Sequence, residues 1–144
     1  MFRVKATNSD AVITSFEIEG KKDGESEVRI YTRQDDYQDH VEDSAGWVKV
    51  FDKKVQVSKN ERTNLELLDE KVTIPAGSTH SFYVFSKKNM LYKKGNGNRG
   101  AFDGDGVLTM MEGIGTKKLF EEPTGSGKFS GGIRYVVFDL ISLP

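Results

Sequence analysis

Cysteine is absent from this chain of 144 residues. Its absence excludes disulfides, thiol chemistry and cysteine metal sites together, but leaves the compartment open, because large β-sheet domains fold without bridges. Histidine is scarce: only His40 and His80 are present, so a histidine metal centre would need carboxylates of unknown placement. His80 and Ser81 are neighbours on an expected strand and point to opposite faces, so they cannot act as base and nucleophile. We expect both histidines at the surface or at strand ends.

Long apolar runs and an excess of one charge sign are also missing. No run approaches the ~18 residues of a membrane span, and the chain does not open with the apolar region of a signal peptide. The 21 Lys and Arg residues are interspersed with 22 acidic residues, so no field draws the chain to nucleic acid or to an anionic membrane. We therefore expect no nucleic-acid binding and no membrane insertion, and a cytosolic location if the chain is complete.

The chain does contain many short β-branched and aromatic runs, separated by clusters of Gly, Asn, Asp and Ser. Val28, Ile30 and Thr32 alternate with polar or aromatic neighbours, as a half-buried strand requires. The pattern predicts one all-β domain over residues 1–144, a two-layer antiparallel β-sandwich, jelly-roll-like, with about ten short strands. The expected strands are residues 2–6, 11–19, 27–33, 47–57, 65–68, 72–74, 80–86, 90–93, 106–111 and 132–140.

Glycine and proline mark the expected connections. Residues 20–24 predict a hairpin loop, and residues 75–78 predict a tight turn in which Pro presets φ and Gly takes the left-handed region. The glycine-rich residues 93–106 predict a long mobile loop, and residues 121–132 predict a second loop. Residues 61–70 are the only segment with the pattern of a short helical turn.

The core should be aromatic and β-branched, because the chain has nine Phe, five Tyr and one Trp. Trp47 is expected to fill the space between the two sheets; the alternative is an exposed indole with a binding role. The other expected core residues are Phe16, Ile18, Val28, Ile30, Val48, Val50, Phe82, Val84 and Ile133.

Asp103 and Asp105 stand at alternate positions beside glycines, like the start of a calcium-binding loop. The bidentate Glu that would close such a loop is replaced by Ile114, although Asn96, Asn98 and nearby carbonyls offer oxygen ligands. The alternative is a solvated turn. Calcium is thus the one cofactor that the sequence suggests.

Exposed aromatic and amide side chains suggest a surface for a partner or a sugar, because aromatic rings bury area while offering a polar edge. The candidates for this surface are Tyr31, Tyr37, Tyr92, Asn96, Asn98 and Arg99.

Several segments resemble an uncharacterised β-sandwich module found, often repeated, in predicted extracellular proteins of diatoms and some bacteria. The segments that carry the resemblance are 1–4, 12–16, 28–32, 46–47, 74–84, 91–92, 107–110, 113–115, 119–120 and 129–135. They are spread over nearly the whole chain, but consist of turn glycines, a core aromatic and strand patterns, so they bear on fold more than on function. The resemblance implies an extracellular location.

We expect a non-enzymatic structural or interaction module, acting in protein–protein contact, self-assembly or adhesion. The alternative is a lectin-like domain that binds carbohydrate or calcium. A hydrolase using loop carboxylates ranks below both, because no acid, base and nucleophile can be placed together. Residues 136–144 are apolar and form either the last strand or a docking extension, which makes self-association a further expectation.

Overall fold

The computed structural model describes residues 1–67, 71–90 and 92–138. It confirms the all-β, sandwich-like fold, with antiparallel sheets packed together. The described residues contain one helix, the four-residue 3-10 turn η1 (Tyr37–His40). No helix among them is long and apolar enough to cross a membrane.

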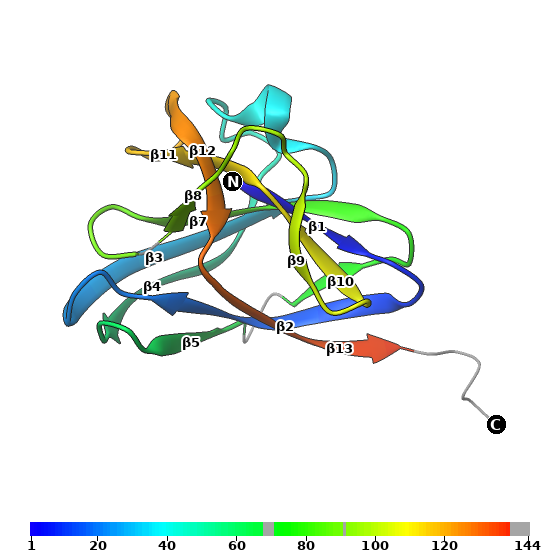
Figure 1. The fold of residues 1–144 in the computed structure, drawn as a ribbon, viewed down its shortest axis with the longest axis horizontal. Helices are drawn as coiled ribbons and strands as arrows, with labels where there is room; N and C mark the ends of the chain where they lie inside the picture. The colour runs from blue at the N-terminus through cyan, green and yellow to red at the C-terminus, as the bar shows by residue number, and fades with distance from the viewer. Residues whose placement is uncertain (68–70, 91, 139–144) are drawn as a thin grey trace.

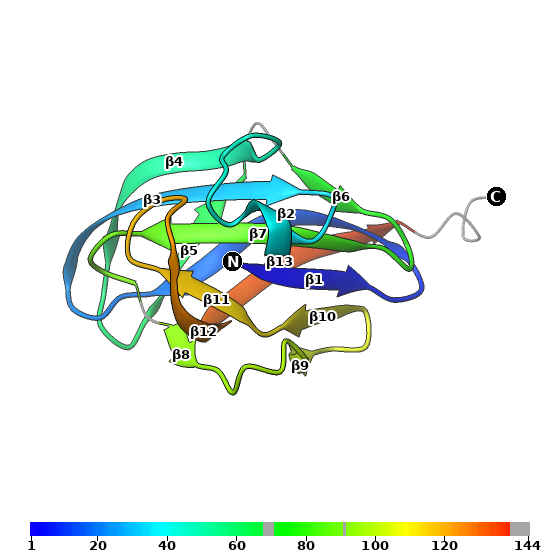
Figure 2. The same cartoon turned by 90° about the horizontal axis from the view of Figure 1, so that it is seen from above.

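Two large sheets form the layers of the sandwich (Figure 1). In Figure 2 the six-stranded sheet runs from β4 to β9, and the four-stranded sheet lies behind it. The six-stranded sheet has the order β4 (Val48–Val57), β3 (Gly24–Arg33), β7 (Thr79–Ser86), β1 (Phe2–Ala6), β10 (Leu108–Met111) and β9 (Ala101–Gly104). The four-stranded sheet contains β13 (Gly131–Phe138), β2 (Asp10–Glu19), β5 (Arg62–Glu66) and β6 (Val72–Ile74), and both β5 and β6 pair with β2.

A third, three-stranded sheet lies at one end of the sandwich. It has the order β11 (Gly113–Thr116), β12 (Pro123–Phe129) and β8 (Tyr92–Lys94). Only Glu112 separates β10 from β11, and only Ser130 separates β12 from β13, so the chain passes almost directly between sheets. We call this sheet the end sheet.

Glycine permits both passages. A Cβ on Gly113 would lie 1.7 Å from the carbonyl oxygen of Met1, and one on Gly131 would lie 1.9 Å from that of Glu17. The backbones therefore approach too closely for any side chain. The backbone nitrogen of Met1 also donates to the carbonyl of Ile114 (2.7 Å), and the Ile114 amide donates to the carbonyl of Met1 (2.9 Å).

The main core fills the space between the two large sheets. Phe16 of β2 and Phe82 of β7 meet edge to face at 5.2 Å, and Phe2 stacks on Phe129 at 4.9 Å. Such aromatic pairs add attraction beyond the area that they bury. Of the expected core residues, Phe16, Ile18, Val28, Ile30, Phe82 and Val84 are buried, and Val50 and Ile133 are partly buried against the core.

The prediction that Val48 lies in the core is wrong, because its side chain is 52% exposed. The register between β3 and β4 shifts between Ile30 and Tyr31, so Ile30 pairs with Phe51 while Tyr31 pairs with Lys49. This β-bulge reverses the alternation of side chains along β4. Phe51 therefore enters the core. Val48 is the first residue of β4, the edge strand of the six-stranded sheet, and is exposed at this end of the sheet.

Trp47 is buried, as expected, but not between the sheets. It belongs to a second apolar cluster with Met1, Tyr37 and Tyr83, separate from the main core. Tyr83 and Phe82 are consecutive on β7 and point to opposite faces of the six-stranded sheet. The second cluster therefore covers the outer face of this sheet, where Trp47 donates from Nε1 to the carbonyl of His40.

His80 lies near the start of β7, at a strand end as expected, but it is buried there and not at the surface. Burial lowers the pKa of its imidazole.

Several expected loops are strands. The glycine-rich residues 93–106 contain β9 and part of β8, and residues 121–132 contain β12. Residues 61–70 do not form a helical turn: residues 62–66 are β5, and residues 68–70 lie outside the described residues. Residues 20–24 join β2 to β3 in different sheets, so they are not a hairpin loop. The turn at 75–78 is confirmed by the bond from the Ser78 amide to the Pro75 carbonyl (2.9 Å).

The expected C-terminal strand exists as β13, which pairs with β2 over its whole length. Val136 and Val137 are exposed on it (51% and 42%). Residues 139–144, the rest of the expected strand or docking extension, lie outside the described residues.

Gly131→Ala should lower the free energy of unfolding by about 1–3 kcal/mol, the usual cost of forcing extra atoms into packed structure. Gly132→Ala is the matched control, because a Cβ there would first meet the flexible end of the Arg62 side chain, at 2.9 Å. Urea denaturation of both variants measures the difference. Equal stability of the two variants would contradict the close approach at Gly131.

Candidate functional site

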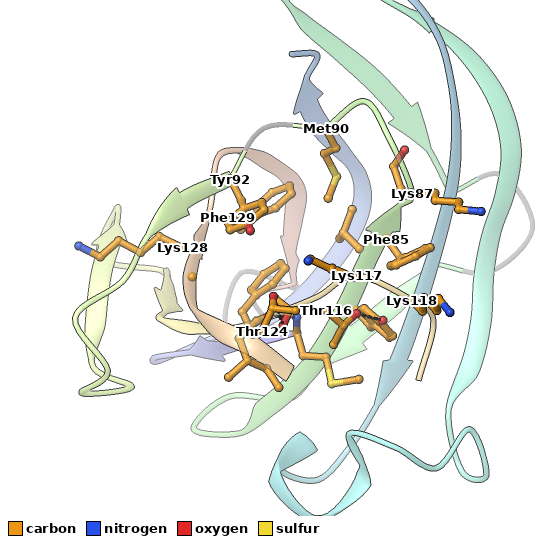
Figure 3. Close-up of a pocket in the computed structure, with 18 of the residues that line it drawn as sticks. Phe85, Lys87, Met90, Tyr92, Thr116, Lys117, Lys118, Thr124, Lys128 and Phe129 are labelled. Carbon is orange, nitrogen blue, oxygen red and sulfur yellow. Dashed lines mark hydrogen bonds between the residues drawn. The ribbon is translucent and has the colours of Figure 1, made fainter. Parts of the chain in front are cut away.

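A cavity of about 660 Å³ lies between the end of β7 and the end sheet (Figure 3). One wall comes from the last residues of β7 and the following residues 87–90. The opposite wall comes from β8, β11 and β12. We call this cavity the lysine pocket, for the reason given below.

The lining of the lysine pocket is mainly apolar. Its apolar members are Met1, Phe2, Tyr83, Val84, Phe85, Met90, Tyr92, Ile114 and Phe129. Phe2 and Phe129 also belong to the main core, and Phe85 and Ile114 pack against the second cluster. The pocket therefore reaches the junction of the two clusters, where the end sheet diverges from β7.

Tyr92 lies across two glycines of the end sheet. Its ring atoms lie 3.6 Å from a Cβ placed on Gly115 and 3.3 Å from one placed on Gly127. The glycines leave a flat backbone surface on which the ring rests, as aromatic residues do beside strand glycines. Tyr92 remains 49% exposed, so this ring offers an apolar face at the pocket.

Six lysines surround the apolar lining: Lys21, Lys87, Lys88, Lys117, Lys118 and Lys128. Among the residues that the structure describes, no Asp or Glu lines this cavity. Figure 3 shows the ammonium of Lys117 directed over the cavity, while Lys87 and Lys118 extend outwards. Lys128 places its ammonium over the ring of Phe102, 5.9 Å from the centroid.

None of these six lysines forms a salt bridge with a described residue. Several cations elsewhere are paired: Arg134 contacts Glu17 at 3.0 Å, and Lys49 contacts Asp52 at 2.9 Å. The lysine pocket is therefore a region of uncompensated positive charge on a chain whose net charge is −1.

Asn89 positions two of the lysine-bearing segments. It is 1% exposed, and its side-chain oxygen accepts hydrogen bonds from the amides of Lys21 (2.8 Å) and Lys22 (3.1 Å). Its nitrogen donates to the carbonyl of Lys22 (3.0 Å). This buried amide ties the β2–β3 connection to residues 87–90, and so brings Lys21 to the pocket.

Hydroxyl groups are the main neutral polar groups of the pocket, supplied by Tyr83, Ser86, Tyr92, Thr116 and Thr124. The Tyr83 hydroxyl is hydrogen-bonded to that of Thr116, and burial raises its pKa, so it stays neutral near pH 7. Thr124 donates to the carbonyl of Gly115 (3.2 Å). Together with the lysines, this lining suits an anionic group attached to an apolar body.

The candidate surface residues do not gather in one place. Tyr92 lines the lysine pocket, whereas Tyr31 packs on Phe120 in the second cluster. Tyr37 is 2% exposed, so it is not available to a partner, which corrects its assignment to an exposed surface. Asn96 and Asn98 are exposed in the connection between β8 and β9.

Arg99 fastens this β8–β9 connection to the 3-10 turn. Its guanidinium donates to Asp36 (2.6 Å) and Gln38 (2.7 Å), and lies 5.0 Å from the centre of the Tyr37 ring. The buried carboxylate of Glu112 accepts a bond from the amide of Gly97 in the same connection. Residues 95–100 are therefore held at two points.

Asp103 and Asp105 are both engaged in local turns. Asp105 accepts hydrogen bonds from the amides of Val107 (3.0 Å) and Leu108 (2.9 Å) and from the hydroxyl of Tyr135. Asp103 accepts one from the amide of Gly104 (2.8 Å). Within the described ranges, no three His, Cys, Asp or Glu side chains are grouped to hold a metal ion. Calcium binding here stays a prediction.

Comparison with known proteins found no matching family model, no matching curated protein and no matching solved structure. The resemblance to the diatom and bacterial module therefore stays a prediction.

The lysine pocket was not predicted from the sequence. Positive and negative charges are interspersed along the sequence, and the lysines of the pocket come from four separate connections and strands. The sequence therefore shows no single cluster of positive charge that contains them. The available signal was the pairing of lysines at 21–22, 87–88 and 117–118, each pair outside the expected strands.

The bond between Tyr135 and Asp105 predicts a pH dependence. Tyr135 lowers the pKa of Asp105 from 3.8, and Asp105 raises that of Tyr135 to about 12. The stabilisation should be fully present between about pH 3.8 and pH 10. It should be lost as pH falls from 3.8 through the lowered pKa of Asp105, and lost as pH rises from 10 through about 12, the raised pKa of Tyr135. Tyr135→Phe should remove the phenol transition near 12 in an ultraviolet titration, whereas Tyr92→Phe should leave it.

If Asp103 and Asp105 bind calcium, millimolar calcium should raise the melting temperature, because a ligand bound only by the native state stabilises that state. Excess chelator should reverse the rise, and Asp103→Asn should abolish it. A melting curve that is the same with and without calcium would assign this segment to the solvated-turn alternative.

Proposed function

We propose that the chain is a non-enzymatic interaction module whose binding site is the lysine pocket. The observation that carries the proposal is the combination of a concave, mainly apolar lining with six lysines that no described acidic residue pairs. Small-molecule sites are typically cavities of about 300–1,000 Å³, mostly apolar, with a few placed polar groups. The lysine pocket, at about 660 Å³, has these properties.

The position of the pocket also supports binding. Strands held in the end sheet and in the six-stranded sheet form its walls, so the cavity is largely pre-formed. A pre-formed site costs little ordering entropy when its ligand enters. The buried Asn89 holds one part of the rim in the same way.

The test uses N-phenyl-1-naphthylamine, a neutral dye whose fluorescence rises in apolar surroundings. It should bind with a stoichiometry of one per chain, because the pocket offers one apolar cavity. Thr124→Trp places an indole at the pocket and should weaken binding by at least about tenfold, a free-energy change of about 1.4 kcal/mol. Fluorescence titration measures the dissociation constant.

Thr73→Trp is the matched control. Thr73 is an exposed threonine on β6, in the four-stranded sheet, and does not line the pocket. It should bind the dye like the unmodified chain. Absence of saturable binding, or an equal loss in both variants, would contradict the proposal.

A further inference from the structure

We propose that the ligand of the lysine pocket is a small amphipathic organic anion, with an apolar ring system or chain ending in a carboxylate, sulfate or sulfonate. This inference rests on the proposed function and deepens it. It assigns the apolar body to the cavity between Phe85, Ile114 and Phe129, and the anionic group to the lysines at its rim.

We infer an apolar body for the ligand from the apolar side chains that line the cavity. Met90 and Tyr92 close one side, and Phe85 and Phe129 face the same space (Figure 3). Because Tyr92 rests on Gly115 and Gly127, its ring is supported from below and its outer face is open to contact. A flat ring or a short alkyl chain would displace water from this surface, which favours binding.

We infer a negative charge on the ligand from the lysines at the rim of the cavity. The pairs Lys87–Lys88 and Lys117–Lys118 flank the cavity from different walls, and the ammonium of Lys117 extends over it. These cations have no acidic partner among the described residues. Like charges around a low-dielectric cleft focus a positive potential and raise the local concentration of anions.

The limited volume favours one small molecule over an extended polymer. A cavity of about 660 Å³ holds a body of drug-like size. A second cavity has a different lining, mainly polar residues such as Asn64 and Glu66 of β5.

The experiment compares two dyes with the same ring system. N-phenyl-1-naphthylamine is neutral, and 8-anilinonaphthalene-1-sulfonate carries an added sulfonate. The anionic dye should bind about tenfold more tightly, the effect of one charge-assisted hydrogen bond. The preference should shrink as sodium chloride is raised, because salt screens charges at the rim.

The double variant Lys117→Gln, Lys118→Gln should bring the two dissociation constants to within about twofold of each other, since it removes both charges and keeps polar side chains. The matched control is Lys53→Gln, Lys54→Gln, an exposed lysine pair on β4 that does not line the pocket. It should keep the tenfold preference. A cooperative melting curve for each variant excludes dye binding to a loosened fold.

Competition extends the test to aliphatic ligands. Decanoate should displace the neutral dye, and decanol should do so about tenfold less well. If the neutral dye binds but neither anion is preferred, the inference is wrong and the proposed function stands. If neither dye binds, both are wrong. Sedimentation with phosphatidylglycerol vesicles that decanoate does not reverse would assign the lysines to a membrane surface and overturn the inference.

Discussion

The architecture depends on two close backbone contacts, where the chain passes from one sheet to another. Gly113 lies against the carbonyl of Met1, and Gly131 lies against that of Glu17, each too close for a Cβ atom. Because the chain makes both passages almost without a connecting loop, β11 and β12 form a separate end sheet with β8. Any substituent at either glycine would push the end sheet away from the sandwich.

The end sheet is also the reason for the lysine pocket. Where it diverges from β7, the main core and the second cluster meet at a surface that neither sheet covers, and Phe85, Ile114 and Phe129 are left to line a cavity. Tyr92 covers the glycines of the end sheet but cannot also fill the space beside them. The site thus results from strand geometry, and the turns on either side supply its charges.

The sequence predicted the strands that alternate, because a half-buried strand imposes a period of two on its side chains. It failed where another constraint is stronger. The strands β11 and β12 contain glycines that backbone or Tyr92 approaches closely, at Gly113, Gly115 and Gly127, and such composition is also typical of loops. The bulge in β4 places Phe51 in the core, a register change that no local pattern reveals. The lysine pocket was missed because only the topology brings its segments together.

The gathering of lysines has no explanation in stability. Exposed ion pairs contribute little to folding, and like charges around one cavity oppose it. Arg99 and Arg134 show what a cation does in this fold when it serves the structure, since each contacts a carboxylate within 3.0 Å. Lys117 and its neighbours do the opposite: they leave their charge uncompensated beside exposed apolar surface. Uncompensated like charges and exposed apolar surface each raise the free energy of the unliganded molecule slightly. An anion with an apolar body would neutralise the charges and cover the apolar surface.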